Sequence, residues 1–203
     1  MAIVDFNPEK PGPDDIQRVY EECMAGIERK FNPSQNPSYS EDFALLSQEA
    51  IEERKRKMLD ELSLRSSFFL LAYIETLFRT DFVMRIESRN KGRKDELTRM
   101  YRNEYNPTRK IFSYSLVDFI FEKWKLYANN QSHSKEMLDI LRVLPQYFDF
   151  RNWMAHGRYW IYKEPTYMRK YNYIQIQILL GNIERYFGLL LKKKILKKKT
   201  LTY

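Results

Sequence analysis

The chain has 203 residues, of which 43% are hydrophobic, 15% aromatic and 31% charged, so it can build one domain with a sizeable core and is not a disordered segment. One cysteine, Cys23, and two histidines, His133 and His156, exclude an internal disulfide, a zinc finger and a three-histidine zinc site. The net charge of +8 is concentrated near the C-terminus, because removing the six lysines of residues 192–199 leaves only +2.

The sequence also excludes two classes of nucleotide-binding site and predicts where in the cell the protein is found. The six glycines form neither the G-x-G-x-x-G fingerprint nor a P-loop. The N-terminus has no signal-peptide pattern, and the longest purely apolar run, 68–74, is far shorter than the roughly 20 residues of a membrane-spanning helix. We therefore expect a soluble cytoplasmic protein that does not engage a membrane.

Helical signals begin near the N-terminus. Asp14-x-x-Gln17 predicts a capping box at the start of a first helix, the composition of 32–40 predicts a loop, and Ser40 is expected to cap the next helix. Residues 41–90 contain no proline or glycine, which predicts either two helices or one bent helix. The second half of this stretch is richly apolar, with Phe69 among the residues expected to be buried.

The remaining predicted helices cover 95–104, 111–128, 134–143, a segment from Pro145 to about Gly157, and 171–194. Pro145 suits the first turn of a helix, and Gly157 suits a helix C-terminus. Buried residues are expected at helical spacing along the last helix: Ile176, Leu180, Ile183, Phe187 and Leu190. Alternation in 174–178 leaves a short strand open there, and 159–162 could also be extended. Helices joined by short loops predict an all-α bundle of about five to seven helices.

The segment Arg151-Asn-Trp-Met-Ala-His-Gly157 carries the residues best suited to chemistry. A guanidinium binds phosphate oxygens bidentately and keeps its charge, and an imidazole serves as a general acid or base near neutral pH. RNA supplies its own nucleophile, the 2′-hydroxyl, so this reaction needs no metal and no cofactor. One histidine cannot easily serve both ends of an in-line displacement, but a two-fold dimer would bring two copies of Arg151 and His156 to one cleft.

This seven-residue string resembles the Arg-x(4–6)-His signature of HEPN domains (higher eukaryotes and prokaryotes nucleotide-binding), in the form with Asn after the Arg and Ala before the His. The resemblance also covers the all-α layout and the position of the motif in a late helix. It implies a dimeric helical bundle and a metal-independent endoribonuclease, in a toxin–antitoxin, phage-defence or RNA-processing system. By the same resemblance, Arg151 and His156 form the active pair and Asn152 is a supporting polar residue.

Other residues are candidates for supporting roles. Glu75 lies in an apolar helical stretch and either orients Arg151 across the bundle or points to solvent. Trp153 and Met154 are expected to pack in the core or at a dimer interface, whereas Tyr159, Trp160 and Tyr162 either stack on bases or pack in the core or at its rim. The lysine tail is expected to attract RNA, or to be a solvated helix end: Lys192, Lys193, Lys194, Lys197, Lys198 and Lys199.

The domain organisation follows from these signals. We predict an N-terminal helix and loop extension over 1–40, a HEPN-like helical bundle over 41–191 and a basic tail over 192–203. The leading functional hypothesis is a homodimeric endoribonuclease that leaves a 2′,3′-cyclic phosphate and a 5′-hydroxyl, with an antitoxin or regulatory protein as a further partner. The alternative is a non-catalytic HEPN-like module that binds RNA, a nucleotide or a protein partner, or acts as a dimerisation scaffold. In that case His156 is a capping or core histidine and Asn152 bonds local backbone.

Overall fold

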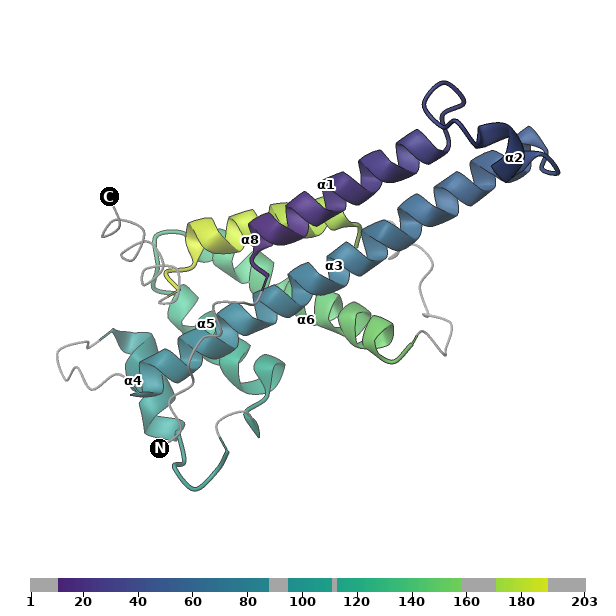
Figure 1. Cartoon of the computed structure of the whole chain (residues 1–203). Coiled ribbons are helices and arrows are strands. Elements are labelled where there is room, and N and C mark those ends of the chain that lie inside the picture. Colours follow the sequence, from purple (N-terminus) through teal and green to yellow (C-terminus); the bar gives the residue numbers. More distant parts are fainter. Residues whose placement is uncertain (1–10, 88–94, 111–112, 158–170, 190–203) are drawn as a thin grey trace, which may run out of the picture. The chain divides into compact units, whose positions relative to one another are not determined.

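The computed structural model describes residues 11–87, 95–110, 113–157 and 171–189, and all regular secondary structure in these ranges is helical (Figure 1). The predicted all-α class is thereby confirmed. The described part contains seven α-helices and one π-helix: α1 (Pro13–Lys30), α2 (Tyr39–Phe43), α3 (Gln48–Glu87), α4 (Glu96–Glu104), η2 (Leu116–Phe121), α5 (Glu122–Ala128), α6 (Ser134–Ala155) and α8 (Tyr173–Tyr186). None of these described helices combines the length and the apolar character needed to cross a membrane.

Two compact units divide the described residues, with boundaries inside α3 after Leu70 and inside α8 after Ile176. We call residues 11–70 with 171–176 the hairpin unit. We call the described residues between 71 and 157, with 177–189, the motif unit, because they include the 151–157 string.

The hairpin unit is built on two long antiparallel helices. α1 and the first part of α3 lie side by side, with α2 in the connection between them (Figure 1). Phe31, Phe43 and Ile51 are buried together near this connection, and Ile27 and Met58 pack against them. Burial of these apolar side chains holds the two helices together.

The motif unit has an aromatic core. Phe78 of α3 contacts the rings of Phe121, Trp124 and Phe187, with ring centroids 5.0, 6.1 and 5.4 Å apart and nearly perpendicular planes. α5 contacts α4, η2 and α6. This packing fixes the second part of α3 and the end of α6, which carry the residues of the candidate site.

The helix starts differ from the predictions at the N-terminus. α1 begins at Pro13, because Pro suits the first helical position and the Asp15 carboxylate accepts a hydrogen bond from the Gly12 N–H at 3.1 Å. The predicted capping box at Asp14 is therefore wrong. Ser40 lies inside α2 rather than before it, since Ser38 precedes the first residue of that helix.

The long stretch after residue 40 forms two helices of very unequal length. α2 ends at Phe43, and α3 then runs without interruption for 40 residues. Phe69, which we expected to be buried, is 53% exposed. The helix predicted over 111–128 starts only at Leu116, as the π-helix η2, and residues 111–112 lie outside the described part.

The prediction that a new helix starts at Pro145 is wrong, because α6 continues through this residue. Pro145 has no N–H to donate to the carbonyl of Leu141, and a proline inside a helix costs about 3 kcal/mol. Leu141, Leu144, Phe148 and Phe150 are buried on both sides of it. Each such burial contributes about 1.5–3 kcal/mol, so packing outweighs the lost hydrogen bond.

The last described helix supports the periodicity argument. Residues 174–178 are helical, so the alternative of a strand there is wrong. Ile176, Leu180, Ile183 and Phe187 are all buried, as their spacing predicts. Leu190, the segment 159–162 and the tail 192–203 lie outside the described residues.

Candidate functional site

The 151–157 string ends helix α6. Arg151 lies near the C-terminal end of the helix, four residues before its final residue, Ala155, and His156 follows Ala155. The backbone N–H of His156 donates to the Asn152 carbonyl at 3.0 Å, and that of Gly157 donates to the Met154 carbonyl at 3.1 Å.

Gly157 makes this end of the helix possible. Its φ of 73° is the left-handed conformation that glycine adopts without strain and that often terminates helices. The side chain of His156 is exposed at this end of α6. The five positions between Arg151 and His156 correspond to about 7.5 Å of helix rise.

Arg151 is joined to Glu75 of α3, the carboxylate that the sequence singled out. The Arg151 Nη2 forms an ion pair with Glu75 Oε2, and the guanidinium lies over the Phe148 ring, 5.8 Å from its centroid. The Glu75 side chain is only 19% exposed and that of Arg151 21%. Of the two orientations considered for Glu75, the structure has the one that faces Arg151.

A second arginine shares the same carboxylate. Arg79 Nε donates to Glu75 Oε1 at 2.6 Å, and Arg79 Nη1 donates to the Tyr114 carbonyl at 3.1 Å. Glu75 therefore bridges two guanidiniums, one on each carboxylate oxygen. We call Glu75, Arg79 and Arg151 the arginine pair cluster.

The arginine pair cluster carries one positive charge more than its single carboxylate neutralises. Burial lowers the pKa of Arg79 and of Arg151, because the charged guanidiniums lose part of their hydration. The Nε of Arg151 is buried, and among the described residues it has no hydrogen-bond partner. A partly desolvated excess of positive charge is the environment that an anion such as a phosphate would complement.

The other residues predicted for the site lie in various environments. Asn152 is exposed, and its backbone carbonyl caps the helix end as described above. Trp153 is buried and stacks on Phe150 with ring centroids 5.8 Å apart, so it packs within the protein. Met154 is half-buried. Tyr159, Trp160, Tyr162 and the six tail lysines lie outside the described residues: Lys192, Lys193, Lys194, Lys197, Lys198 and Lys199.

Sequence reasoning missed Arg79. The available signal was its position four residues after Glu75 in a locally apolar stretch of the helix, which places both side chains on one face. A carboxylate with an arginine at this spacing predicts an ion pair, but spacing alone does not show that Arg151 joins it.

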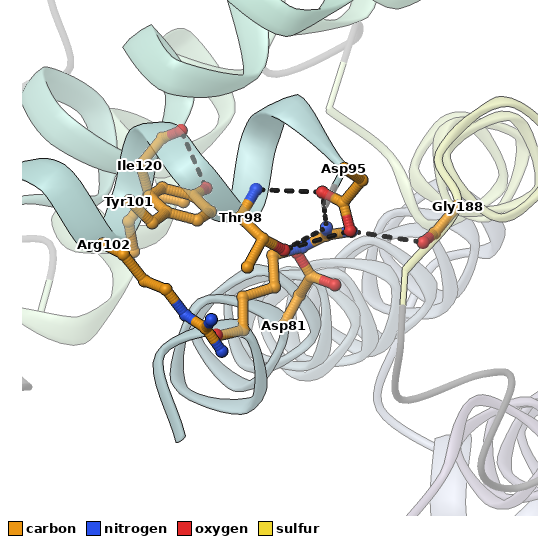
Figure 2. A network of polar contacts seen from close by, with 8 residues as sticks. Asp81, Asp95, Thr98, Tyr101, Arg102, Ile120 and Gly188 are labelled. Carbon is orange, nitrogen blue, oxygen red and sulfur yellow. Dashed lines mark hydrogen bonds and ion pairs between the residues drawn. The ribbon is translucent and has the colours of Figure 1, made fainter. Parts of the chain in front are cut away.

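A second polar cluster lies near the end of α3 and is drawn in Figure 2. Arg85 Nε donates to Asp81 Oδ2 at 2.6 Å, and Arg85 Nη1 donates to Asp95 Oδ1 at 2.8 Å and to Thr98 Oγ1 at 3.2 Å. The Gly188 carbonyl accepts from Arg85 Nη2 at 3.5 Å. Two carboxylates thus more than neutralise this guanidinium, so the cluster ties α3 to α4 and to the chain after α8 and offers no excess positive charge to an anion.

The electrostatics of this second cluster differ from those of the arginine pair cluster. Burial by itself lowers the pKa of Arg85, but the charge and hydrogen bond of Asp81 and the charge of Asp95 outweigh burial and raise the pKa above its ordinary value. Burial, and secondarily the charge of Asp81, raises the pKa of the nearby Tyr101 phenol well above its ordinary value. The Tyr101 hydroxyl donates to the Ile120 carbonyl at 3.3 Å.

Within the described ranges, no group of three or more His, Cys, Asp or Glu side chains is placed to hold a metal ion. The chain was compared with models of known protein families, with curated proteins and with solved structures, and none of them matches it. A functional assignment therefore depends on the motif and on the contacts around it.

Proposed function

We propose that this protein is a metal-independent endoribonuclease of HEPN type that acts as a homodimer. In the proposed reaction the 2′-hydroxyl of RNA attacks the adjacent phosphorus, and the bond from phosphorus to the 5′-oxygen of the next nucleotide breaks. The products are a 2′,3′-cyclic phosphate and a 5′-hydroxyl. DNA is inert in this scheme, because it lacks the 2′-hydroxyl.

Arg151 binds the scissile phosphate in this scheme and stabilises the negative charge that builds on its oxygens. The ion pair with Glu75 supports this role, since it holds the long arginine side chain in one orientation before RNA binds. Glu75 is thus a positioning residue, and Arg79 keeps the Glu75 carboxylate in place and adds positive charge.

His156 moves the protons. In one protomer it accepts the proton of the attacking 2′-hydroxyl, and the partner subunit's His156 donates a proton to the departing 5′-oxygen. Exposure of His156 at the end of α6 supports this role, because both RNA and a second subunit need access to it. Asn152, exposed one residue after Arg151, is a polar residue that could assist in binding RNA.

The observation that carries the proposal is the joint placement of the string's two chemical groups. The C-terminal part of α6 presents Arg151 to a half-buried carboxylate with excess positive charge around it, and His156 is exposed in the turn that follows the helix. The two residue types that the proposed chemistry requires are therefore held at one end of one helix.

The test is cleavage of mixed RNA in EDTA by the purified full chain and four variants. His156→Ala and Arg151→Ala should each lower the rate at least about a hundredfold, the effect expected for a general acid–base group or an oxyanion-stabilising group. His133→Ala changes the other histidine, exposed at the opposite end of the same helix, and Arg142→Ala changes an exposed arginine of α6. Both controls should cleave at the wild-type rate, and activity surviving in His156→Ala would contradict the proposal.

The alternative is a non-catalytic module that binds RNA, a nucleotide or a protein. The ion pair of Arg151 with Glu75 is equally compatible with this alternative, since a structural arginine forms the same contact. In that case the tail lysines dominate affinity for RNA, binding falls steeply with salt, and deletion of residues 192–199 abolishes it. The nuclease proposal instead requires residual cleavage after this deletion.

The proposed activity also suggests a biological setting. An endoribonuclease of this kind would suit a toxin–antitoxin or phage-defence system, with an antitoxin or regulatory protein as its partner. Expression of the wild-type chain should then arrest growth of the host cell, and His156→Ala should relieve the arrest without lowering the amount of protein.

A further inference from the structure

The hairpin unit contains a groove that plays no part in the proposed cleavage reaction. Its volume is about 640 Å³. Its lining residues recur every three or four positions on α1 and α3, so one face of each helix forms one wall of the groove. On α1 they extend from Cys23 to Lys30, and on α3 they extend from Arg54 to Arg65.

The floor of the groove is apolar. Ile27, Met58 and Leu62 line it and are half-buried, and the first two pack against the buried core at the hairpin connection. Gly26 also lines the groove, and a Cβ atom built on it would meet no heavy atom within 4 Å. The groove therefore has room for a side chain from outside directly above Gly26.

The rim of the groove is basic. Lys30, Arg54, Lys57 and Arg65 line it and are exposed, whereas Glu61 is the one acidic residue among the described lining residues. Among the described lining residues, four positive charges against one negative charge give a net charge of +3.

Two of these cations already have weak partners. Lys57 pairs with Glu53 at 3.3 Å, and Arg65 pairs with Glu61 at 3.0 Å. Exposed pairs of this kind contribute little to stability, so an incoming carboxylate could replace them at small cost.

We propose that this groove binds an acidic amphipathic helix of a protein partner. The α3 wall spans eleven residue steps, about 16 Å, which matches about three turns of a bound helix. An apolar stripe would bury the floor, and flanking Glu or Asp side chains would meet the basic rim. This is the established mode in which a helix docks into a groove.

The lining residues favour a protein helix over RNA. No Trp, Tyr, Phe or His is among the described residues that line the groove, so unpaired bases would find no stacking surface. A phosphate backbone would also leave the apolar floor in water. The proposal does not depend on ribonuclease activity, since the groove belongs to the hairpin unit and the motif to the other unit.

The test uses a designed peptide of about 18 residues, long enough to form a helix, with Leu at helical spacing flanked by Glu. Cys23 lines the groove, is exposed and is the one cysteine of the chain, so its thiol reports occupancy. The acidic peptide should bind the full chain in fluorescence anisotropy and slow the reaction of Cys23 with a thiol reagent. A peptide with every Glu replaced by Lys, and a scrambled acidic peptide, should do neither.

Two variants and one control test whether the peptide binds in this groove. Gly26→Phe fills the groove and should lower the affinity for the acidic peptide at least about tenfold. Gly181→Phe is the matched control, because Gly181 is an exposed glycine of α8 that likewise has no heavy atom within 4 Å of an added Cβ. It should leave binding unchanged. The reversal Lys30→Glu with Arg54→Glu should exchange the preference, so that the Lys peptide now binds more tightly than the Glu peptide.

Three results would overturn the proposal. The first is absence of binding by the acidic peptide, or equal binding to wild type and to Gly26→Phe. The second is that single-stranded RNA slows the reaction of Cys23 in the wild-type chain but not in Gly26→Phe. This result would assign the groove to RNA. The third is a dimer in sedimentation that Gly26→Phe dissociates, which would assign the groove to a second copy of this chain.

Discussion

Replacement of Glu75 by Gln should destabilise the protein, because it leaves two like charges where one carboxylate now stands between them. Glu75 accepts from Arg79 on one oxygen and pairs with Arg151 on the other. The side chains of Glu75, Arg79 and Arg151 are 19%, 27% and 21% exposed. This burial is intermediate between that of surface pairs, worth about 0–1 kcal/mol, and that of buried pairs, whose disruption costs about 3–5 kcal/mol.

We therefore expect Glu75→Gln to lower the free energy of unfolding by about 2–3 kcal/mol, measured by urea denaturation. Arg79→Gln should cost less, about 1–2 kcal/mol, because it leaves the pair of Glu75 with Arg151 intact. The double variant should lose less stability than the two single losses combined, with a coupling of about 1 kcal/mol. A third variant, Glu87→Gln, changes an exposed glutamate at the end of the same helix and should be neutral within about 0.5 kcal/mol.

One result would refute this reasoning. If Glu75→Gln were as stable as Glu87→Gln, and the double variant showed no coupling, then the carboxylate would not hold the two arginines together. The same result would contradict the proposed role of Glu75 in positioning Arg151.

Three further predictions concern stability. Asp81→Asn should cost about 3–5 kcal/mol in urea denaturation, because it leaves the buried Arg85 with less compensation; a loss below about 1 kcal/mol would contradict the structural role of that ion pair. The raised pKa of Tyr101 means that the unfolded chain ionises first, so stability should fall as the pH rises above about 10. This fall should be smaller in Tyr101→Phe, and an identical pH profile would refute the assignment. Gly26→Ala and Gly181→Ala should each raise the thermal midpoint, since each gains about 0.5–1 kcal/mol of helix propensity in open space; a lower midpoint would show a clash.

The sequence predicts helix type well where apolar spacing is regular. The last helix is the clearest case, because Ile176, Leu180 and Ile183 of α8, and Phe187 directly after it, are all buried at the predicted spacing. It fails where a local signal competes with packing over a longer range. Pro145 is such a signal, and the buried side chains around it keep α6 continuous. The helix starts near Asp14 and Ser40 are wrong for a different reason, because a competing local signal decides them: Pro13 and the Asp15–Gly12 hydrogen bond set the start of α1, and Ser38 precedes α2.

In the candidate site, too, the sequence predicts what is local and misses contacts between distant segments. The 151–157 string is visible in the sequence because its residues are close along the chain. The contact of Arg151 with Glu75 joins positions 76 residues apart, so the sequence could offer it only as one of two orientations. Arg79, the groove of the hairpin unit and the Arg85 cluster depend on side chains from separate segments, and no short pattern predicts which segments meet.

The central claim is that Arg151 and His156 cleave RNA through its own 2′-hydroxyl. The most direct measurement compares, in EDTA, an RNA with the same RNA carrying a single 2′-deoxynucleotide at the cleaved position, with the product ends identified by mass spectrometry. We expect a 2′,3′-cyclic phosphate from the RNA, no cleavage at the 2′-deoxy position, and no product from either substrate with His156→Ala. Cleavage at the 2′-deoxy position, or a product ending in a 3′-hydroxyl, would contradict it.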